Sequence, residues 1–158
     1  MTMIRLMRWF KTIGLVSGLL ALGFLPSQAM AFSCSVKLVK TVCWKDRALI
    51  LKVINADNLE TETIHELEQD KSFLEVPLDC KKLNRVSFEV SFDPPIWEAD
   101  KGRFYKAKRL WNIPKRLPLG ADNWSIDLCF ARDFSSVPLP LVDFTKCTCP
   151  NEHELLEQ

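Results

Sequence analysis

The sequence predicts a small all-β domain, mostly antiparallel, that forms a disulfide-stapled β-sandwich or open barrel after a signal peptide is cleaved. Three observations support this prediction. Apolar and polar residues alternate along several short segments with the period of a half-buried strand. Turn-forming residues separate these segments, and six cysteines follow an N-terminal segment typical of exported proteins.

Residues 1–31 contain the three regions of a secretory signal peptide in the usual order. Three basic residues come first, an apolar run from residue 13 to residue 25 follows, and small residues flank Met30. We place the cleavage between Ala31 and Phe32. The apolar run has 13 residues, whereas a membrane-spanning helix needs about 20. We therefore expect no stable membrane span after cleavage, and a periplasmic or extracellular product.

Residues 32–158 are expected to form a single β-rich domain that ends in a short polar tail at about residues 151–158. Without the three basic residues of the signal peptide, 18 Lys and Arg residues face 20 Asp and Glu residues. Such a balance provides no bulk attraction to nucleic acid or to an anionic membrane. Nucleic acid is therefore not an expected partner.

Alternation of apolar and polar side chains identifies the individual strands. Four segments show it: residues 72–78, 85–92, 105–113 and 124–130. Residues 36–42 and 48–54 are apolar and β-branched, with a less regular phase. Residues 59–71 fit either an edge strand or a short helix. Residues 137–141 contain two prolines and form an extended edge at best.

The six cysteines predict a disulfide framework, because signal peptides lead to oxidising compartments. They are Cys34, Cys43, Cys80, Cys129, Cys147 and Cys149. A continuous strand would place Cys34 and Cys43 about 30 Å apart, too far for a disulfide. Cys147 and Cys149 are two residues apart, so a bond between them would be strained. We expect Cys34 or Cys43 to bond with the Cys147/Cys149 pair, which would tie the two ends of the domain together.

No motif for catalysis or for a cofactor is present in the sequence. After residue 31 the glycines are Gly102 and Gly120, which excludes a glycine-rich phosphate loop, and no Gly-x-Ser-x-Gly element occurs. The two histidines, His65 and His153, lie in an acidic stretch and in the polar tail. We expect both at the surface rather than in the activation of a nucleophile.

The spacing of Cys147, Cys149 and His153 would permit a soft metal ion such as Cu(I) or zinc. In an oxidising compartment, however, we expect each of the two thiols to form a structural disulfide rather than to bind a metal ion. We therefore expect neither a metal nor a cofactor.

The tryptophans divide into inward positions and positions next to turns. Trp124 is in phase with the apolar face of its segment, and Trp111 is in phase with Ile113, so both are predicted to lie in the core. Trp44 and Trp97 border turns. Trp97 closely follows two prolines and is the tryptophan expected to be most exposed, where a rigid indole can anchor a partner.

The charge distribution offers two interpretations. Residues 101–116 hold seven basic residues and no acidic one, with aromatic residues interleaved, whereas residues 57–79 hold eight acidic residues and one lysine. The two segments are solvated faces, or they oppose each other across neighbouring strands, or the basic one binds an anionic partner.

The leading functional hypothesis is an exported, non-catalytic binding module. Its partner would be an unknown protein or an anionic glycan or lipid head group. The expected contact residues are Trp97, Arg103, Tyr105, Lys106, Lys108 and Arg109. Two alternatives stay open: a small hydrolase that uses Asp93, Glu98 or Asp100, and a structural envelope protein or enzyme inhibitor.

Overall fold

The computed structural model describes residues 32–140 and 147–149. This part of the chain consists of β-strands, two short 3-10 helices and loops, which confirms the predicted all-β class. It contains no helix long and apolar enough to cross a membrane. The proposed signal peptide with Ala31, the polar tail and His153 lie outside the described residues.

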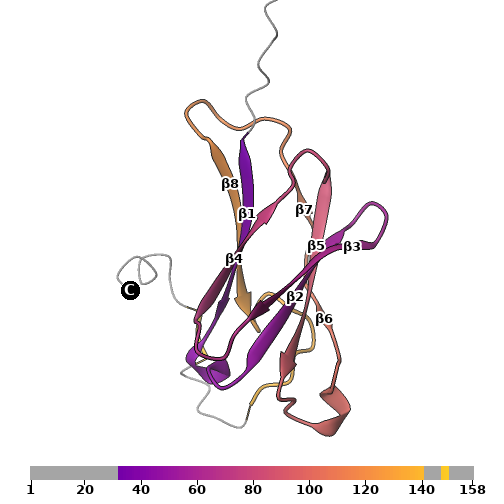
Figure 1. The fold of residues 1–158 in the computed structure, drawn as a ribbon, viewed down its shortest axis with the longest axis vertical. Helices are drawn as coiled ribbons and strands as arrows, with labels where there is room; N and C mark the ends of the chain where they lie inside the picture. Colours follow the sequence, from indigo (N-terminus) through magenta and orange to yellow (C-terminus); the bar gives the residue numbers. More distant parts are fainter. Residues whose placement is uncertain (1–31, 141–146, 150–158) are drawn as a thin grey trace, which may run out of the picture. The chain divides into compact units, whose positions relative to one another are not determined.

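Sheet A contains three strands in the order β4-β1-β8 (Figure 1). The strand β1 (Ser33–Lys40) pairs antiparallel with β4 (Phe73–Leu78) and parallel with β8 (Asn123–Phe130). The parallel pair brings the first and the last strand of the domain side by side. The domain is therefore mostly, not wholly, antiparallel.

Sheet B contains five strands, all paired antiparallel, in the order β3-β2-β5-β6, with β7 also paired to β5. Their bounds are β2 (Ala48–Asn55), β3 (Glu60–Leu67), β5 (Arg85–Asp93), β6 (Tyr105–Lys106) and β7 (Trp111–Asn112). The ambiguous segment 59–71 thus contains the edge strand β3 rather than a helix. The 3-10 helices are η1 (Val42–Trp44) and η2 (Glu98–Asp100).

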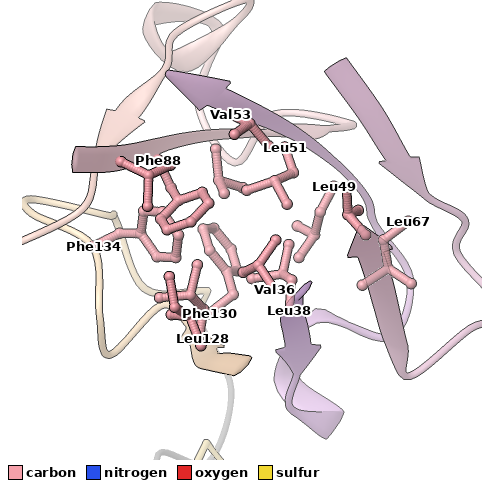
Figure 2. Packing of buried hydrophobic residues seen from close by; sticks show 14 of the residues in the cluster. Val36, Leu38, Leu49, Leu51, Val53, Leu67, Phe88, Leu128, Phe130 and Phe134 are labelled. Carbon is pink, nitrogen blue, oxygen red and sulfur yellow. The ribbon is translucent and has the colours of Figure 1, made fainter. Parts of the chain in front are cut away.

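The core lies between the inner faces of the two sheets, as Figure 2 shows. The alternating residues of β5 (Val86, Phe88, Val90 and Phe92) are all buried, and so are Ile126, Leu128 and Phe130 of β8. The rings of Phe92 and Phe130 lie 6.1 Å apart, centre to centre, and join the sheets. Burial of apolar area between two such sheets supplies the main driving force for folding.

Trp111 and Trp124 differ from their predicted core positions, and Trp44, which the sequence places beside a turn, is buried. Trp44 is only 1% exposed, and its indole packs edge-on against Phe130 at 4.5 Å. A position beside a turn is therefore compatible with complete burial. Trp111 and Trp124 are half-buried at the margin of the core rather than inside it.

Residues 105–113 do not form the single strand that their alternation predicts. Two short strands, β6 and β7, occupy its ends. The Ala107 amide still donates to the Phe88 carbonyl of β5 at 2.8 Å. On the side away from β5, the Lys108 amide donates to the Asp133 carbonyl at 2.9 Å, and the Ser135 amide donates to the Lys106 carbonyl at 2.8 Å. Residues 137–140 likewise form no regular strand.

Three disulfides join the six cysteines: Cys34–Cys80, Cys43–Cys147 and Cys129–Cys149. The Cα atoms within each pair lie 5.3–6.0 Å apart, within the range that a disulfide requires. The Cys43–Cys147 bond confirms the expected link between the two ends of the domain. Both excluded pairings are indeed absent.

Candidate binding surface

Basic and acidic side chains lie at opposite edges of sheet B. The strands of the basic segment, β6 and β7, form one edge, and the acidic strand β3 forms the other. Two strands, β2 and β5, lie between them, so the edges are about 14 Å apart at the usual strand spacing. Strands β3 and β6 are not neighbours, so the acidic side chains of β3 do not neutralise the basic side chains of β6 across paired strands.

The basic edge, as we use the term, comprises Arg103, Lys106, Lys108, Arg109 and Arg132. All five are exposed, and the Arg132 side chain is 62% exposed even though it pairs with Asp133. In the described part of the chain, Arg103, Lys108 and Arg109 form no ion pair within 4.0 Å. Positive charge at this edge is therefore available to a partner.

Aromatic rings support three of the cations near this edge. The guanidinium of Arg103 lies 5.3 Å from the centre of the Tyr105 ring, and that of Arg109 lies 4.8 Å from the Trp111 ring. The ammonium of Lys52 lies 3.4 Å from the centre of the Phe104 ring. A ring face restricts a long side chain while leaving its charge unneutralised. The basic and aromatic residues that alternate in sequence thus pack against one another.

Tyr105 differs from the other predicted contact residues, because it is buried. Only 2% of its surface is exposed, and its ring stacks on Phe92 at 5.6 Å. Its hydroxyl donates a hydrogen bond to Oδ1 of the buried Asp100 at 2.9 Å. Burial first, and then the Asp100 hydrogen bond and charge, raise the pKa of Tyr105 to about 12. Tyr105 therefore fixes the loop that carries Arg103, and it offers no contact area itself.

Trp97 is 55% exposed, as predicted, at the residue before η2. The Asp100 amide donates to the carbonyl oxygen of Trp97 at 2.8 Å, and the Asp100 carboxylate accepts from the Tyr105 hydroxyl. Asp100 thus links the backbone of Trp97 to the buried Tyr105. The Trp97 indole thus lies on a braced loop, near in sequence to Arg103. An exposed indole on a restrained backbone loses little entropy on binding.

Lys106 extends from the outer face of sheet B. It is opposite Glu89 of β5, with Nζ 4.0 Å from the carboxylate, and Glu89 is in turn opposite Lys52 of β2. Ile64 of β3 follows Lys52 in this cross-strand row. The single negative charge of Glu89 offsets only part of the positive charge of Lys106 and Lys52, so this row of side chains keeps a net positive charge.

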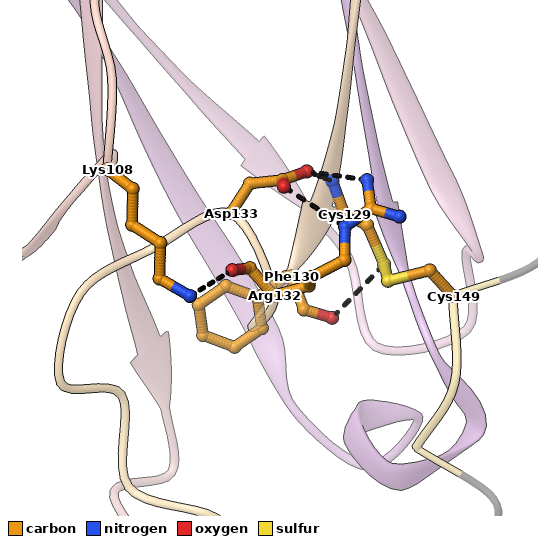
Figure 3. Close-up of a disulfide and its surroundings, with 6 residues drawn as sticks. All are labelled: Lys108, Cys129, Phe130, Arg132, Asp133 and Cys149. Atoms are coloured by element: carbon orange, nitrogen blue, oxygen red, sulfur yellow. Dashed lines mark hydrogen bonds and ion pairs between the residues drawn. A yellow bond between two sulfur atoms is a disulfide. The ribbon is translucent and has the colours of Figure 1, made fainter.

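Lys108, Arg132 and Asp133 form a connected cluster beside the Cys129–Cys149 disulfide (Figure 3). The Lys108 ammonium donates to the Arg132 carbonyl, and the Asp133 carboxylate accepts from the Arg132 guanidinium at 2.9 Å and from the Cys129 amide at 2.7 Å. Burial opposes ionisation of Asp133, but these hydrogen bonds and the nearby charge of Arg109 lower its pKa overall. Asp133 is therefore a fixed anion that orders the cations around it.

Arg132 and Lys52 were not among the predicted site residues. Both are distant in sequence from residues 101–116. The pairing of β2 with β5 brings Lys52 near them, and the bonds between residues 106–108 and residues 133–135 bring Arg132 near them. No local pattern in the sequence could have revealed these neighbours.

The carboxylates proposed for a hydrolase have different environments. Glu98 is exposed and lies 3.9 Å from the Lys101 ammonium, whereas Asp100 is only 7% exposed and bonds to Tyr105. Asp93 is exposed at the end of β5. Among residues 32–140 and 147–149, no three His, Cys, Asp or Glu side chains could together hold a metal ion. Cys147 and Cys149 are both engaged in disulfides.

A hollow of about 410 Å³ lies on sheet A, at the start of β1. Its lining residues are Ser33, Cys34, Ser35, Glu75, Pro77 and Asn123. The lining contains one ionisable side chain, Glu75, and is open to solvent. An open hollow of this kind does not enclose a ligand, whereas small-molecule sites bury most of the surface of the molecule they bind.

Comparison of the chain with protein-family models, with curated proteins and with solved structures yields no match.

Proposed function

We propose that this protein is an exported, non-catalytic binding module and that its basic edge, with Trp97 beside it, binds an anionic partner. One observation supports this most directly: Arg103 and Arg109 lie over aromatic rings without an ion-pair partner in the described residues. Exposed cations usually gain little from the protein itself, so such restrained groups without a direct ion pair are suited to an external anion.

The chemistry of the partner follows from the guanidinium groups. Each presents several N–H donors in a plane, which match the oxygens of a carboxylate, a sulfate or a phosphate. The partner is accordingly an acidic glycan, a lipid head group or an acidic protein surface. Periplasmic or extracellular placement is supported by the three disulfides, which persist in oxidising compartments.

The test measures binding of the secreted protein to two probes, a sulfated polysaccharide and vesicles that contain phosphatidylglycerol. The triple variant Arg103→Glu, Lys106→Glu, Arg109→Glu reverses three charges at the basic edge. We expect it to lose at least about tenfold in affinity for the probe that the wild type binds, and we expect wild-type binding to weaken with added salt.

The matched control reverses three exposed lysines outside the basic edge: Lys45→Glu, Lys71→Glu and Lys81→Glu. It has the same net charge as the test variant, so a general charge effect would weaken both equally. Equal affinity of the wild type and the folded test variant, or an equal loss in both variants, would overturn the proposal.

A further inference from the structure

We infer that a second copy of this chain is a partner of the basic edge, and that it docks through the acidic strand β3. This inference rests on the proposed function, because the basic edge forms one half of the contact. The two edges carry opposite charge on the same sheet of every copy. Copies can therefore associate head to tail, with β6 and β7 of one beside β3 of the next.

Among the described residues, the acidic edge has exposed carboxylates outside any ion pair and a strand edge without a partner strand. In the described part of the chain, β3 pairs with β2 on one side and with no strand on the other. Glu60, Glu66 and Glu68 are exposed there and form no ion pair among the described residues, whereas Glu62 is already bonded to Lys82. A strand edge of this kind presents unpaired N–H and C=O groups to a neighbour.

An exposed aliphatic side chain accompanies the charges at each edge. Ile64 is 58% exposed on β3, and Leu110 is 55% exposed between Arg109 and Trp111. An apolar centre within a charged rim is the usual composition of a protein–protein interface. Both edges thus have an exposed aliphatic side chain among charged residues, and the charges are of opposite sign. This complementarity favours a contact between two copies over two edges that only face solvent.

Charge also decides the symmetry of the contact. Two β3 edges brought together would oppose the acidic residues Glu60, Glu66 and Glu68 with acidic residues of the other copy, and like charges disfavour that arrangement. At the basic edge, the backbone of residues 106–108 is already bonded to residues 133–135. The contact is therefore heterologous, and it joins basic side chains of one copy to the acidic side chains of the next.

Sedimentation velocity of the disulfide-bonded protein gives the first measurement. At about 0.02 M salt we expect the weight-average sedimentation coefficient to rise with protein concentration, and at about 0.5 M salt we expect it to stay at the monomer value. Ile64→Ser should weaken the association at low salt. A wild type that remains monomeric at low salt and high concentration would overturn the inference.

A charge exchange tests which edges meet. The basic-edge variant carries Lys106→Glu and Arg109→Glu, and the acidic-edge variant carries Glu66→Lys and Glu68→Lys. Each variant alone has one edge whose net charge is largely cancelled, so it should stay monomeric. An equimolar mixture should associate again, because it combines the unchanged acidic edge of one variant with the unchanged basic edge of the other. Circular dichroism and intact disulfides confirm that both variants fold. Association of either folded variant alone, or no association of their mixture, would overturn the inference.

The two proposals fail in distinguishable ways. A monomeric wild type that still binds the polysaccharide or the vesicles through the basic edge would retain the proposed function and overturn only the inference. A wild type that binds neither probe and stays monomeric would overturn both. Binding of a lysine-rich peptide to β3 of a monomeric wild type would assign the acidic edge to a different protein and would also overturn the inference.

Discussion

The ammonium group of Lys40 donates a hydrogen bond to the backbone carbonyl oxygen of Glu68 at 2.7 Å and thereby links the end of β1 in sheet A to the end of β3 in sheet B. The same group donates to the carbonyl oxygens of Arg47 at 2.9 Å and Gln69 at 2.8 Å. Its three protons thus have three acceptors. Burial lowers the pKa of Lys40, although the charges of Asp70 and Asp46 act against this.

Replacement of this ammonium should destabilise the whole domain. In Lys40→Met a side chain of similar length remains, but three carbonyl oxygens lose their donor. We expect a loss of about 2–4 kcal/mol in the free energy of unfolding, measured by urea denaturation, because buried acceptors without a donor are costly. Lys45→Met, at an exposed lysine, is the control and should change little. Equal midpoints for the two variants would show that Lys40 is dispensable.

Trp44 and Trp97 give a second prediction with the same change at both sites. Trp44 is almost fully buried against Phe92 and Phe130, so Trp44→Ala should cost about 3–5 kcal/mol through lost contacts and a residual cavity. Trp97 is largely exposed, so Trp97→Ala should change stability by less than about 0.5 kcal/mol.

Thermal denaturation of both tryptophan variants checks this difference, since each loses one indole of the same size. If the Trp97 variant were the less stable of the two, its loop would contribute to the fold and could not serve simply as a platform for a partner. A stable Trp97 variant, by contrast, permits its use in binding measurements.

The inner faces of β5 and β8 could be predicted from the sequence because each strand has one apolar face and pairs over its full length. In β5, Val86, Phe88 and Val90 are all fully buried, as their alternation indicates. The positions of the cysteines also limited their pairing correctly, since reach along an extended chain is a simple geometric quantity.

The parts that could not be predicted depend on partners distant in sequence. Alternation assigns residues 105–113 to one strand, but the structure has two short strands there, and Ala107 between them forms an additional bridge to Phe134. Tyr105 lies among basic residues, a pattern that predicts a surface position, yet its place on β6 opposite Val90 turns it inward. The basic surface therefore lacks Tyr105, which the sequence predicts as a contact residue, and it includes Arg132, which the sequence does not predict.

The disulfides should differ in their contribution according to the length of chain that each one closes. Cys43–Cys147 spans 104 residues, Cys34–Cys80 spans 46 and Cys129–Cys149 spans 20. Loss of loop-closure entropy in the unfolded chain predicts costs in that order, about 3–5 kcal/mol each at most.

Three double alanine variants, one for each disulfide, test this order by urea denaturation under non-reducing conditions. The Cys43/Cys147 variant should have the lowest midpoint. If the Cys129/Cys149 variant is the least stable instead, packing beside Phe130 and Asp133 outweighs the entropy of the unfolded chain. In the unmodified denatured protein, alkylation should label no thiol before reduction and six cysteines after it.

The titration of Tyr105 provides a direct probe of the loop beside the basic edge, because it is the single tyrosine of the chain. Absorbance at the phenolate band therefore reports this residue alone. In the folded protein we expect a midpoint at about pH 12, and in urea a return to about 10. Asp100→Asn keeps an acceptor but removes the charge, so its midpoint should fall below that of the wild type and remain above the value in urea.

The same shift predicts how stability depends on alkaline pH. Tyr105 is an acid whose pKa is higher in the folded state, so its contribution is complete below about pH 10 and is lost as the pH rises toward 12. The two-unit difference corresponds to at most about 3 kcal/mol. Tyr105→Phe removes this dependence, and its free energy of unfolding should fall less than that of the wild type between pH 10 and 12. A folded wild type whose phenolate forms at the same pH as in urea would contradict both the buried ring and the Asp100 hydrogen bond.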